Sequence, residues 1–375
     1  MEKLQPKLRF PDFVGSWNKN KLGDLFYISA GGDIKQEFVS QTKNETFKYP
    51  IYANAEKNKG FYAYSSIYKI DEDVITIAGR GVNIGIAHAR KEKFYPIVRL
   101  LVLKPKNNLS VDFFEYAINN FDIVVESTGV PQLTAPQISN YEIFYTDFKE
   151  QTKIANFLSS IDEKLNLLKE KKTLLEDYKK GILQKIFNQE IRFKDNNGND
   201  FENWVEKSLG NIAEVNKGNQ LNKDDLNDFD VYPSISGGIE PSGYTDKFNR
   251  NENTIIISEG GNSCGYVNFI KTKFWCGGHC YSIDILATDK FDNDYLYQLL
   301  KFNQNEIMAL RVGSGLPNIQ KKDLKNFLLK LSINKIEQTK IANFLSAIDK
   351  KIELVSNQIQ NIQDYKKGLL QQMFV

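Results

Sequence analysis

The sequence predicts an α+β protein with two pseudo-repeated mixed α/β globular domains, separated by two long antiparallel helices that form a coiled-coil spacer. Three observations support this fold class. One segment occurs twice without a gap. Both copies carry apolar residues in a heptad pattern, which is typical of coiled coils. The regions before the copies contain β-branched runs bounded by turn residues, which indicate strands.

The internal repeat sets the order of the chain. Residues Glu150 to Phe187 align without a gap with Glu337 to Phe374 at an offset of 187 residues, and 22 of the 38 aligned positions are identical. The regions before the two copies match only at scattered framework points. One duplication explains both observations if the helices kept one task and the globules diverged to two tasks. Gene conversion of the helix segments alone is the alternative.

The scattered framework points divide the chain into four segments. They are short motifs in the same order: Leu8–Trp17 with Ile191–Phe193 and Trp204, Leu22–Asp24 with Leu209–Asn211, Tyr49-Pro50 with Tyr232-Pro233, Gly60-Phe61 with Gly243-Tyr244, and Thr128–Gln132 with Ser314–Asn318. We expect globular domains over residues 1–149 and 188–336, a central spacer helix over 150–187 and a C-terminal one over 337–375. The last pair of motifs contains Gly and Pro, so we expect a tight turn that acts as a hinge.

The two spacer segments are predicted to pair along an apolar seam. The seam residues are Ile154, Leu158, Ile161, Leu165, Leu168, Leu175, Ile182 and Ile186 in the first copy, and Ile341, Leu345, Ile348, Ile352, Val355, Ile359, Ile362, Leu369 and Met373 in the second. Lys172, Lys179 and Lys366 interrupt the seam, and we expect their ammonium groups to extend into water. Connectivity favours an antiparallel pair with one globule at each end. The helical rise gives a spacer of about 50 Å.

Several polar positions outside the seam are identical in both copies. We predict that they bind two copies of one partner: Gln151, Lys153, Asn156, Tyr178 and Lys180, with Gln338, Lys340, Asn343, Tyr365 and Lys367. Thr152, Asp162 and Lys179 are also identical in both copies, and packing between the helices is not expected to require any of these side chains. The alternative is a solvated charged face that has not changed since the duplication.

Both globules show a mixed pattern of strands and short helices. The runs Val74–Ala78, Ile97–Leu103 and Thr254–Ser258 are rich in β-branched and other apolar residues and are predicted to be strands. Short helices are predicted over Asp112–Asn119 and Asp294–Lys301.

The loops of both globules collect side chains that suit DNA. The predicted DNA-binding residues are Lys57, Lys59, Arg80, Asn83 and Arg90 in the first globule, and Lys217, Gln220, Arg250, Asn262, His279 and Arg311 in the second. Arg, Asn and Gln can form paired hydrogen bonds with guanine or adenine, and Lys mostly contacts phosphates. The loops therefore predict DNA binding as a group, although each lysine alone is more often a solvated surface residue than a DNA contact.

Composition limits the class of protein. Apolar residues make up 41% of the chain and the net charge is +2, which argues against a protein that coats DNA. No run of eighteen apolar residues is present, so we expect no membrane span. The charged N-terminus argues against secretion. Three cysteines cannot form a disulfide framework, so we expect a cytoplasmic protein.

The sequence predicts no catalytic and no metal site. The glycine loop at Gly79–Gly85 has no Walker lysine, and two histidines leave little for general-base chemistry. No Asn-Pro-Pro-aromatic stretch is present to grip a flipped adenine. Cys276, His279 and Cys280 suggest zinc, but a structural zinc needs four ligands, only Cys264 remains elsewhere as a thiol, and the other half has no equivalent.

The whole pattern resembles the specificity subunit of type I restriction-modification systems. The resemblance rests on Pro6–Phe13 with Trp17 and Leu22–Asp24, on the two Gly-x-Pro turns, and on the two helix starts that read Glu-Gln-Thr-Lys-Ile-Ala-Asn-Phe-Leu-Ser. It covers essentially the whole chain. It implies that each globule is a target recognition domain for one half of a bipartite site in double-stranded DNA.

The resemblance also implies partners. The helices would form a spacer that docks two modification subunits, which carry S-adenosylmethionine and methylate adenine. Restriction subunits would add ATP- and Mg-dependent translocation and cleavage. This chain itself is then expected to be non-catalytic and to hold no cofactor.

Two other interpretations stay open at this level. A free-standing DNA-binding regulator should bind its site tightly as a pure protein, whereas a specificity subunit should need its methyltransferase. A coiled-coil adaptor should not depend on DNA at all.

Overall fold

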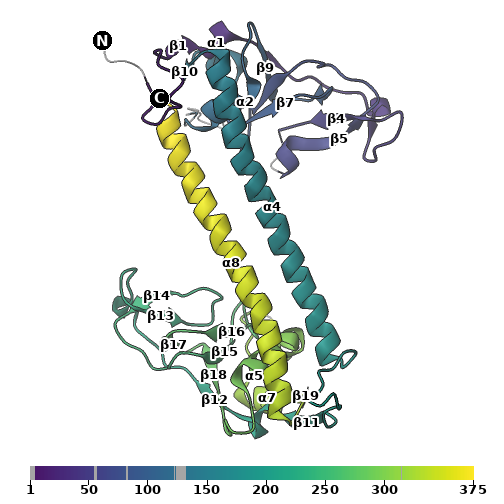
Figure 1. Ribbon diagram of the computed structural model, residues 1–375, viewed down its shortest axis with the longest axis vertical. Coiled ribbons are helices and arrows are strands. Elements are labelled where there is room, and N and C mark those ends of the chain that lie inside the picture. Colours follow the sequence, from purple (N-terminus) through teal and green to yellow (C-terminus); the bar gives the residue numbers. More distant parts are fainter. Residues whose placement is uncertain (1–4, 55–56, 82, 122, 124–131, 314) are drawn as a thin grey trace. The chain divides into compact units, whose positions relative to one another are not determined.

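The chain folds into two compact units. The computed structural model describes residues 5–54, 57–81, 83–121, 123, 132–313 and 315–375. Unit 1 comprises Met1–Lys169 and Asn357–Val375, and unit 2 comprises Glu170–Ser356. Each unit therefore contains one globule and a part of both long helices, α4 (Phe148–Phe187) and α8 (Lys335–Met373) (Figure 1).

The globule of unit 1 is built on two four-stranded sheets. Its elements are β1 (Asn18–Lys21), α1 (Leu22–Leu25), β2 (Phe26–Ala30), η1 (Gln36–Phe38), β3 (Val39–Ser40), β4 (Tyr49–Tyr52), η2 (Lys57–Gly60), β5 (Phe61–Ser65), β6 (Val74–Ala78), β7 (Ala87–Arg90), β8 (Tyr95–Pro96), β9 (Leu100–Pro105), α2 (Val111–Asn119), α3 (Ala135–Ser139) and β10 (Glu142–Tyr145). The main sheet has the order β2-β9-β6-β7, the second sheet has the order β3-β5-β4-β8, and β1 pairs with β10.

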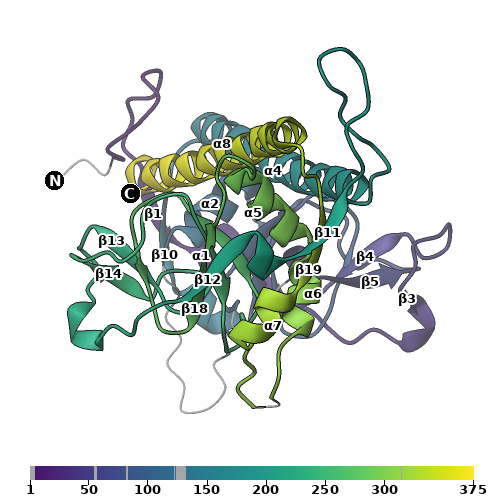
Figure 2. The ribbon, with the colours of Figure 1, turned by 90° about the horizontal axis from the view of Figure 1, so that it is seen from below.

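Unit 2 repeats this arrangement. Its elements are β11 (Val205–Ser208), η3 (Leu209–Asn211), β12 (Ala213–Lys217), η4 (Lys223–Asp225), β13 (Tyr232–Ile235), β14 (Gly243–Thr245), β15 (Thr254–Ser258), β16 (Val267–Ile270), β17 (Trp275–Cys276), β18 (Cys280–Ile285), α5 (Asn293–Phe302), α6 (Gln304–Ala309), α7 (Lys321–Asn326) and β19 (Leu328–Leu331) (Figure 2). The main sheet has the order β12-β18-β15-β16, the second sheet has the order β14-β13-β17, and β11 pairs with β19. Each strand of the main sheet therefore has a counterpart in unit 1.

The central strands β6 and β15 are buried along their whole length because both faces of the main sheet are covered. In unit 1, Ile75 and Ile77 of β6 pack into a large core with α2, whereas Val74 faces a small core that contains Tyr52 and Phe94. Unit 2 divides β15 in the same way between a large core with α5 and a small core behind the sheet.

The predicted strands and short helices are present. Two strands match their predicted bounds, Val74–Ala78 and Thr254–Ser258. The third begins at Leu100 rather than Ile97, because residues 97–99 cross from the second sheet to the main sheet. The predicted helices are α2 and α5.

A buried carboxylate fixes the start of α4 to the globule of unit 1. The Glu150 side chain is fully buried, and its two oxygens accept hydrogen bonds from Arg9 at 2.6 and 2.7 Å. Next to it, Gln151 is 1% exposed, accepts from the Ser110 amide at 2.8 Å and donates to the Thr146 carbonyl at 2.7 Å. These contacts hold the first turn of the helix against α2 and the end of β10.

Unit 2 repeats this anchor at the start of α8. Glu337 is fully buried and accepts from Arg192, at 3.0 Å for the closest pair of atoms, and from the Trp204 indole at 3.0 Å. Gln338 accepts from the Asp292 amide at 2.8 Å and donates to the Ser332 carbonyl at 2.8 Å. The structure therefore explains why these polar residues are identical in both copies.

The segment that precedes each globule, residues 8–17 in unit 1 and 191–204 in unit 2, forms an arm. The first arm packs along α4 and the second along α8. Phe10 meets Phe157 edge-on with ring centroids 5.8 Å apart, and Phe193 meets Phe344 at the same distance. The weak sequence similarity between Leu8–Trp17 and the segment from Ile191 to Trp204 therefore reflects two arms that pack in the same way on their helices.

Ion pairs link α4 and α8 within each unit. In unit 1, the Lys366 ammonium lies 2.5 Å from Asp162, and in unit 2 the Lys179 ammonium lies 2.6 Å from Asp349. The Asp162 carboxylate also accepts from the Tyr116 hydroxyl at 2.6 Å. The two pairs are counterparts at the offset of 187 residues.

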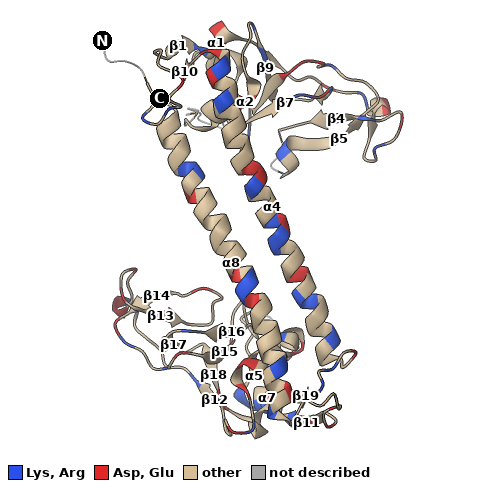
Figure 3. Cartoon of the chain, viewed as in Figure 1, with Lys and Arg blue, Asp and Glu red and all other residues tan. Residues whose placement is uncertain are grey.

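These ion pairs correct two expectations. The ammonium groups of Lys179 and Lys366 do not extend freely into water, and packing between the helices does use the identical residues Asp162 and Lys179. Charges of both signs lie along the rest of both helices (Figure 3). Within each unit the two helices run antiparallel, because the start of one and the end of the other share the large core.

Among the described residues, no helix is long and apolar enough to cross a membrane. The three cysteines are free and buried, and Cys276 and Cys280 belong to the small core of unit 2.

Replacement of Glu150 by Gln should destabilise unit 1. The change leaves the Arg9 guanidinium without its buried partner, and breaking such a pair costs about 3 kcal/mol. The matched control is Glu142→Gln, which breaks a pair with Lys19 whose side chains are 42% and 54% exposed and should cost less than about 0.5 kcal/mol. Chemical denaturation checks both values, and equal effects of the two variants would contradict the anchor.

Candidate nucleic-acid interface

A cleft opens in unit 2 where four loops converge. Its volume is about 460 Å³, and it is lined by Ser236, Gly237, Gly238, Gly260, Gly261, Ser263, His279, Leu316, Pro317 and Asn318. These residues follow β13, follow β15, precede β18 and form the turn before α7. Several lining residues are glycines, so the backbone itself is accessible in the cleft.

The same loops have the same backbone frame in unit 1. The amide of Gly79 donates to the Arg99 carbonyl at 3.0 Å, and the amide of Glu259 donates to the His279 carbonyl at 2.8 Å. Gly85 and Gly265 both have positive φ. Their amides donate hydrogen bonds of 2.8 Å to the carbonyls of Ala78 and Ser258, the last residues of β6 and β15, and so close the turn that follows each strand. Arg99 and His279 are therefore equivalent positions.

A side chain also ties two of these loops together in each unit. In unit 1, Asn54 accepts from the Arg80 amide at 3.3 Å and donates to the Arg80 carbonyl. In unit 2, the Ser263 hydroxyl donates to the Gly237 carbonyl. Different residues thus close the same frame.

The side chains on this frame differ between the units. In unit 2, the Glu259 carboxylate accepts from Lys217 at 2.7 Å and from Tyr281 at 3.0 Å, and its other oxygen lies 4.0 Å from His279 Nδ1. Burial and this carboxylate raise the pKa of Tyr281. The counterpart of Glu259 is Gly79, where a Cβ would lie 2.5 Å from the Arg99 carbonyl oxygen. Unit 1 therefore cannot hold this network.

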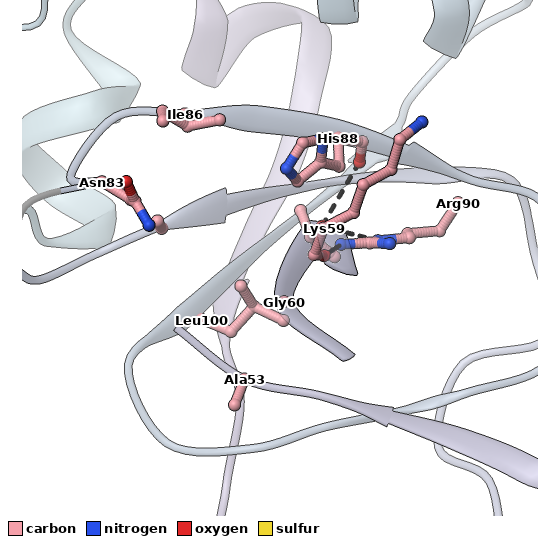
Figure 4. A pocket seen from close by; sticks show the side chains of 10 residues that line it. Ala53, Lys59, Gly60, Asn83, Ile86, His88, Arg90 and Leu100 are labelled. Atoms are coloured by element: carbon pink, nitrogen blue, oxygen red, sulfur yellow. Dashed lines mark hydrogen bonds between the residues drawn. The ribbon is translucent and has the colours of Figure 1, made fainter. Parts of the chain in front are cut away.

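In unit 1, a smaller cavity of about 200 Å³ lies beside the loops (Figure 4). Three predicted DNA-binding residues line it, Lys59, Asn83 and Arg90. Lys59 is exposed and has a φ of 53°, whereas Asn83 is half-buried. Lys57 begins η2, but its side chain is outside the described part of the structure.

Arg90 has an internal role. It is 5% exposed, donates to Thr76 Oγ1 at 3.0 Å and to the Lys59 carbonyl, and lies 3.6 Å from the centre of the Tyr52 ring. Burial lowers its pKa. Its guanidinium therefore connects the two sheets rather than forming a free surface.

In unit 2, the predicted DNA-binding residues also divide into one with an internal role and others that are exposed or line the cleft. Arg250 donates to Ser282 Oγ at 2.8 Å and to the Asn249 carbonyl at 2.7 Å, so it also has an internal role. Gln220, Asn262 and Arg311 are exposed, and His279 lines the cleft.

The seven arginines of the chain fall into two groups. The guanidinium groups of four of them form internal hydrogen bonds: Arg9, Arg90, Arg192 and Arg250. For the other three, the described residues provide no hydrogen-bond or ion-pair partner to the guanidinium: Arg80, Arg99 and Arg311. All three belong to segments that form or adjoin the cleft loops. Sequence reasoning missed Arg99, which stands in an apolar run that predicts a buried strand.

The Gly-x-Pro turn of unit 2 forms one wall of the cleft. Leu316 is 87% exposed at its tip, and the Pro317 carbonyl accepts from the Gly261 amide at 3.1 Å. In unit 1, residues 128–131 of the corresponding motif lie outside the described residues, and Gln132 pairs with Arg80.

The predicted partner-binding residues separate into three groups. Gln151 and Gln338 are buried in the helix anchors. Lys153 pairs with Asp12, and Lys340 donates to the Lys194 carbonyl at 2.7 Å, so both hold the arms. The remaining residues are exposed on α4 and α8: Asn156, Tyr178, Lys180, Asn343, Tyr365 and Lys367.

The fold and the corresponding loops define a class of protein in which one loop-bearing α/β frame is repeated and joined through long helices. The family model described as Type I restriction modification DNA specificity domain matches residues 15–177 and 201–364. These two ranges cover most of the chain, so the chain belongs to this family.

Individual relatives agree with this assignment. A protein of Mycoplasma genitalium named as a type I specificity subunit is 35% identical over 158 residues, which are 42% of this chain and 41% of that relative. This chain thus spans about two fifths of the length of that relative in the alignment.

Two solved structures have a similar fold. The crystal structure of a type I restriction-modification system S subunit from M. genitalium has a TM-score of 0.75 at 19% identity and covers 99% of both chains. A chain from a study of complex assembly and conformational transition of the type I R-M system has a TM-score of 0.53 at 14% identity, covering 94% of this chain and 96% of that one.

Arg90 and Arg80 should differ in their effect on stability. Arg90→Met leaves the Lys59 carbonyl and Thr76 hydroxyl without their donor, which should cost about 2 kcal/mol or more. Arg80→Met removes a guanidinium without an internal partner and should cost less than about 0.5 kcal/mol. Thermal unfolding of both variants checks this, and a larger loss for Arg80→Met would contradict the assignment of internal roles.

Proposed function

We propose that the chain is the sequence-specific DNA-recognition subunit of a type I restriction-modification complex, and that each globule reads one half of a bipartite site. The observation that carries this proposal is the set of corresponding loops in the two globules, which share backbone hydrogen bonds but present different side chains. A duplicated reader that has diverged only in its loops suits a site with two different halves.

The chemistry of the clefts supports DNA as the ligand. Exposed or half-buried Arg80, Asn83 and Arg311 can form paired hydrogen bonds to base edges. Lysines near the loops, such as Lys59, can contact phosphates. The net charge of +2 suits a subunit that holds its site within a larger complex.

The long helices are proposed to set the gap between the two halves. The supporting observation is that the ion pairs between α4 and α8 occur in both units at equivalent positions, which fixes one register of the pair. A spacer of about 50 Å corresponds to roughly 15 bp of DNA.

Inserting one heptad into both helices should lengthen the gap. Seven residues add about 10 Å, or roughly 3 bp, and leave both half-sites unchanged. The measurement is long-read mapping of methylated adenines in cells that co-express the variant and its methyltransferase subunits. An unaltered gap would reject the spacer role, and an absence of any bipartite methylation by the natural chain would reject the proposed function.

Two modification subunits are proposed to dock on the helices. Asn156 and Leu167 of unit 1 are exposed and lie eleven residues apart, close to three helical turns, so they share one face of α4. Asn343 and Leu354 of unit 2 repeat this pair on α8, and both leucines are 59% exposed. An exposed apolar residue retained at both repeat positions supports a partner surface over a solvated face.

The docked modification subunits are proposed to supply S-adenosylmethionine and adenine methylation. Restriction subunits are proposed to add ATP-dependent cleavage. Our chain would contribute recognition and geometry, and no catalytic group.

Leu167→Lys combined with Leu354→Lys should weaken docking. A charge at each apolar contact should reduce the fraction of modification subunit that co-purifies with the chain by about tenfold or more, since each desolvated ammonium costs well over 1.4 kcal/mol. The matched control is Leu174→Lys, because Leu174 is 62% exposed but its repeat position is Asn361. Equal loss in the control, or no loss in the double variant, would contradict this surface.

A further inference from the structure

We propose that Arg99 and His279 are the equivalent specificity-determining positions of the two globules, and that Arg99 reads a guanine in the half-site of unit 1. This proposal rests on the proposed DNA recognition. It adds the residue, the base and the prediction that the two half-sites differ at this one framework position.

The equivalence of the two positions rests on hydrogen bonds. Each residue immediately precedes the long strand of the main sheet, β9 or β18, and its carbonyl accepts a hydrogen bond from the amide of the residue that follows β6 or β15. Two residues earlier in each chain segment, the amides of Ile97 and Gly277 donate to the carbonyls of the last residues of β4 and β13, at 2.9 and 2.8 Å. His279 lines the cleft of unit 2, and Arg99 is its counterpart among the loops of unit 1.

Arg99 is available for a ligand. Its side chain is exposed, and the described residues contain no hydrogen-bond or ion-pair partner for its guanidinium. Its backbone has a φ of 70°, which an arginine rarely adopts. Backbone hydrogen bonds on both sides hold this conformation: the Arg99 carbonyl accepts from the Gly79 amide, and the Leu100 amide donates to the Ile97 carbonyl at 3.2 Å. Such outliers concentrate at functional sites.

Three other polar side chains of these loops form internal hydrogen bonds. Asn54 and Ser263 tie two loops together, and Glu259 is held by Lys217 and Tyr281. At position 99/279, both globules carry a hydrogen-bonding side chain, and its type differs between them.

The chemistry of the two side chains predicts different bases. A guanidinium donates two parallel hydrogen bonds, which match N7 and O6 of guanine and no other base edge in the major groove. An imidazole offers one ring nitrogen to a base, while the other lies near Glu259 Oε2 at 4.0 Å. The half-site of unit 1 should therefore be more strictly specified at this position than the half-site of unit 2.

The test uses the full chain co-expressed with its methyltransferase subunits, followed by long-read mapping of methylated adenines. Arg99→Ala should relax one guanine position in one half-site, with discrimination falling roughly tenfold or more, while the gap and the other half-site stay unchanged. Arg99→Lys should relax the same position, because lysine keeps the charge but loses the paired geometry. His279→Ala should alter only the other half-site.

Three outcomes would overturn the proposal. They are unchanged specificity in Arg99→Lys, relaxation at a position that is not guanine, and equal relaxation of both half-sites. Arg99→Lys guards against misfolding of the alanine variant, since it keeps the side-chain length and the charge. Bipartite methylation by the natural chain together with unaltered specificity in both Arg99 variants would reject the role of Arg99 while sustaining DNA recognition. No bipartite methylation by the natural chain would reject the proposed function itself.

Discussion

The fully buried carboxylates of Glu150 and Glu337 fix the first turn of each long helix onto its globule, and the position of the other functional elements depends on this constraint. A buried carboxylate is stable only when charged donors surround it, and Arg9 and Arg192 provide them from the two arms. Arm, globule and helix are therefore joined at one point in each unit. Pairs such as Asp162 with Lys366 then hold the neighbouring helix to the same assembly.

This rigid anchoring allows the loops to vary. Equivalent backbone hydrogen bonds define these loops in both units, and the equivalent positions carry different side chains, Gly79 or Glu259 and Arg99 or His279. The variation of side chains on one frame is the physical basis on which two globules of common origin can read different half-sites.

Sequence reasoning predicted the repeat, the helices and the central strands, because apolar periodicity and β-branched runs follow directly from burial. The roles of single polar residues were harder to predict. Gln151 and Gln338 were expected to bind a partner, yet they are buried beside the anchors. Nothing in a single sequence distinguishes a polar residue retained for an internal hydrogen bond from one retained for a partner.

The arginines show the same limit within the cleft. Arg90 and Arg250 were predicted to bind DNA, but their guanidinium groups connect strands and loops inside the globules. Arg99 was missed because it follows apolar residues in Ile97–Leu103, where only the crossing of the chain between two sheets exposes a side chain. Such a crossing depends on contacts that are distant in sequence, so local patterns do not reveal it.

The most direct test of the central claim is photo-crosslinking of the assembled complex to a duplex that contains its recognised site, with 5-iodouracil placed in either half. Mass spectrometry then locates the cross-linked residues. We expect cross-links in the loops after β6 and before β9 of unit 1 for one half, and in the corresponding cleft loops of unit 2 for the other. Cross-links confined to the long helices, or to one globule for both halves, would contradict it.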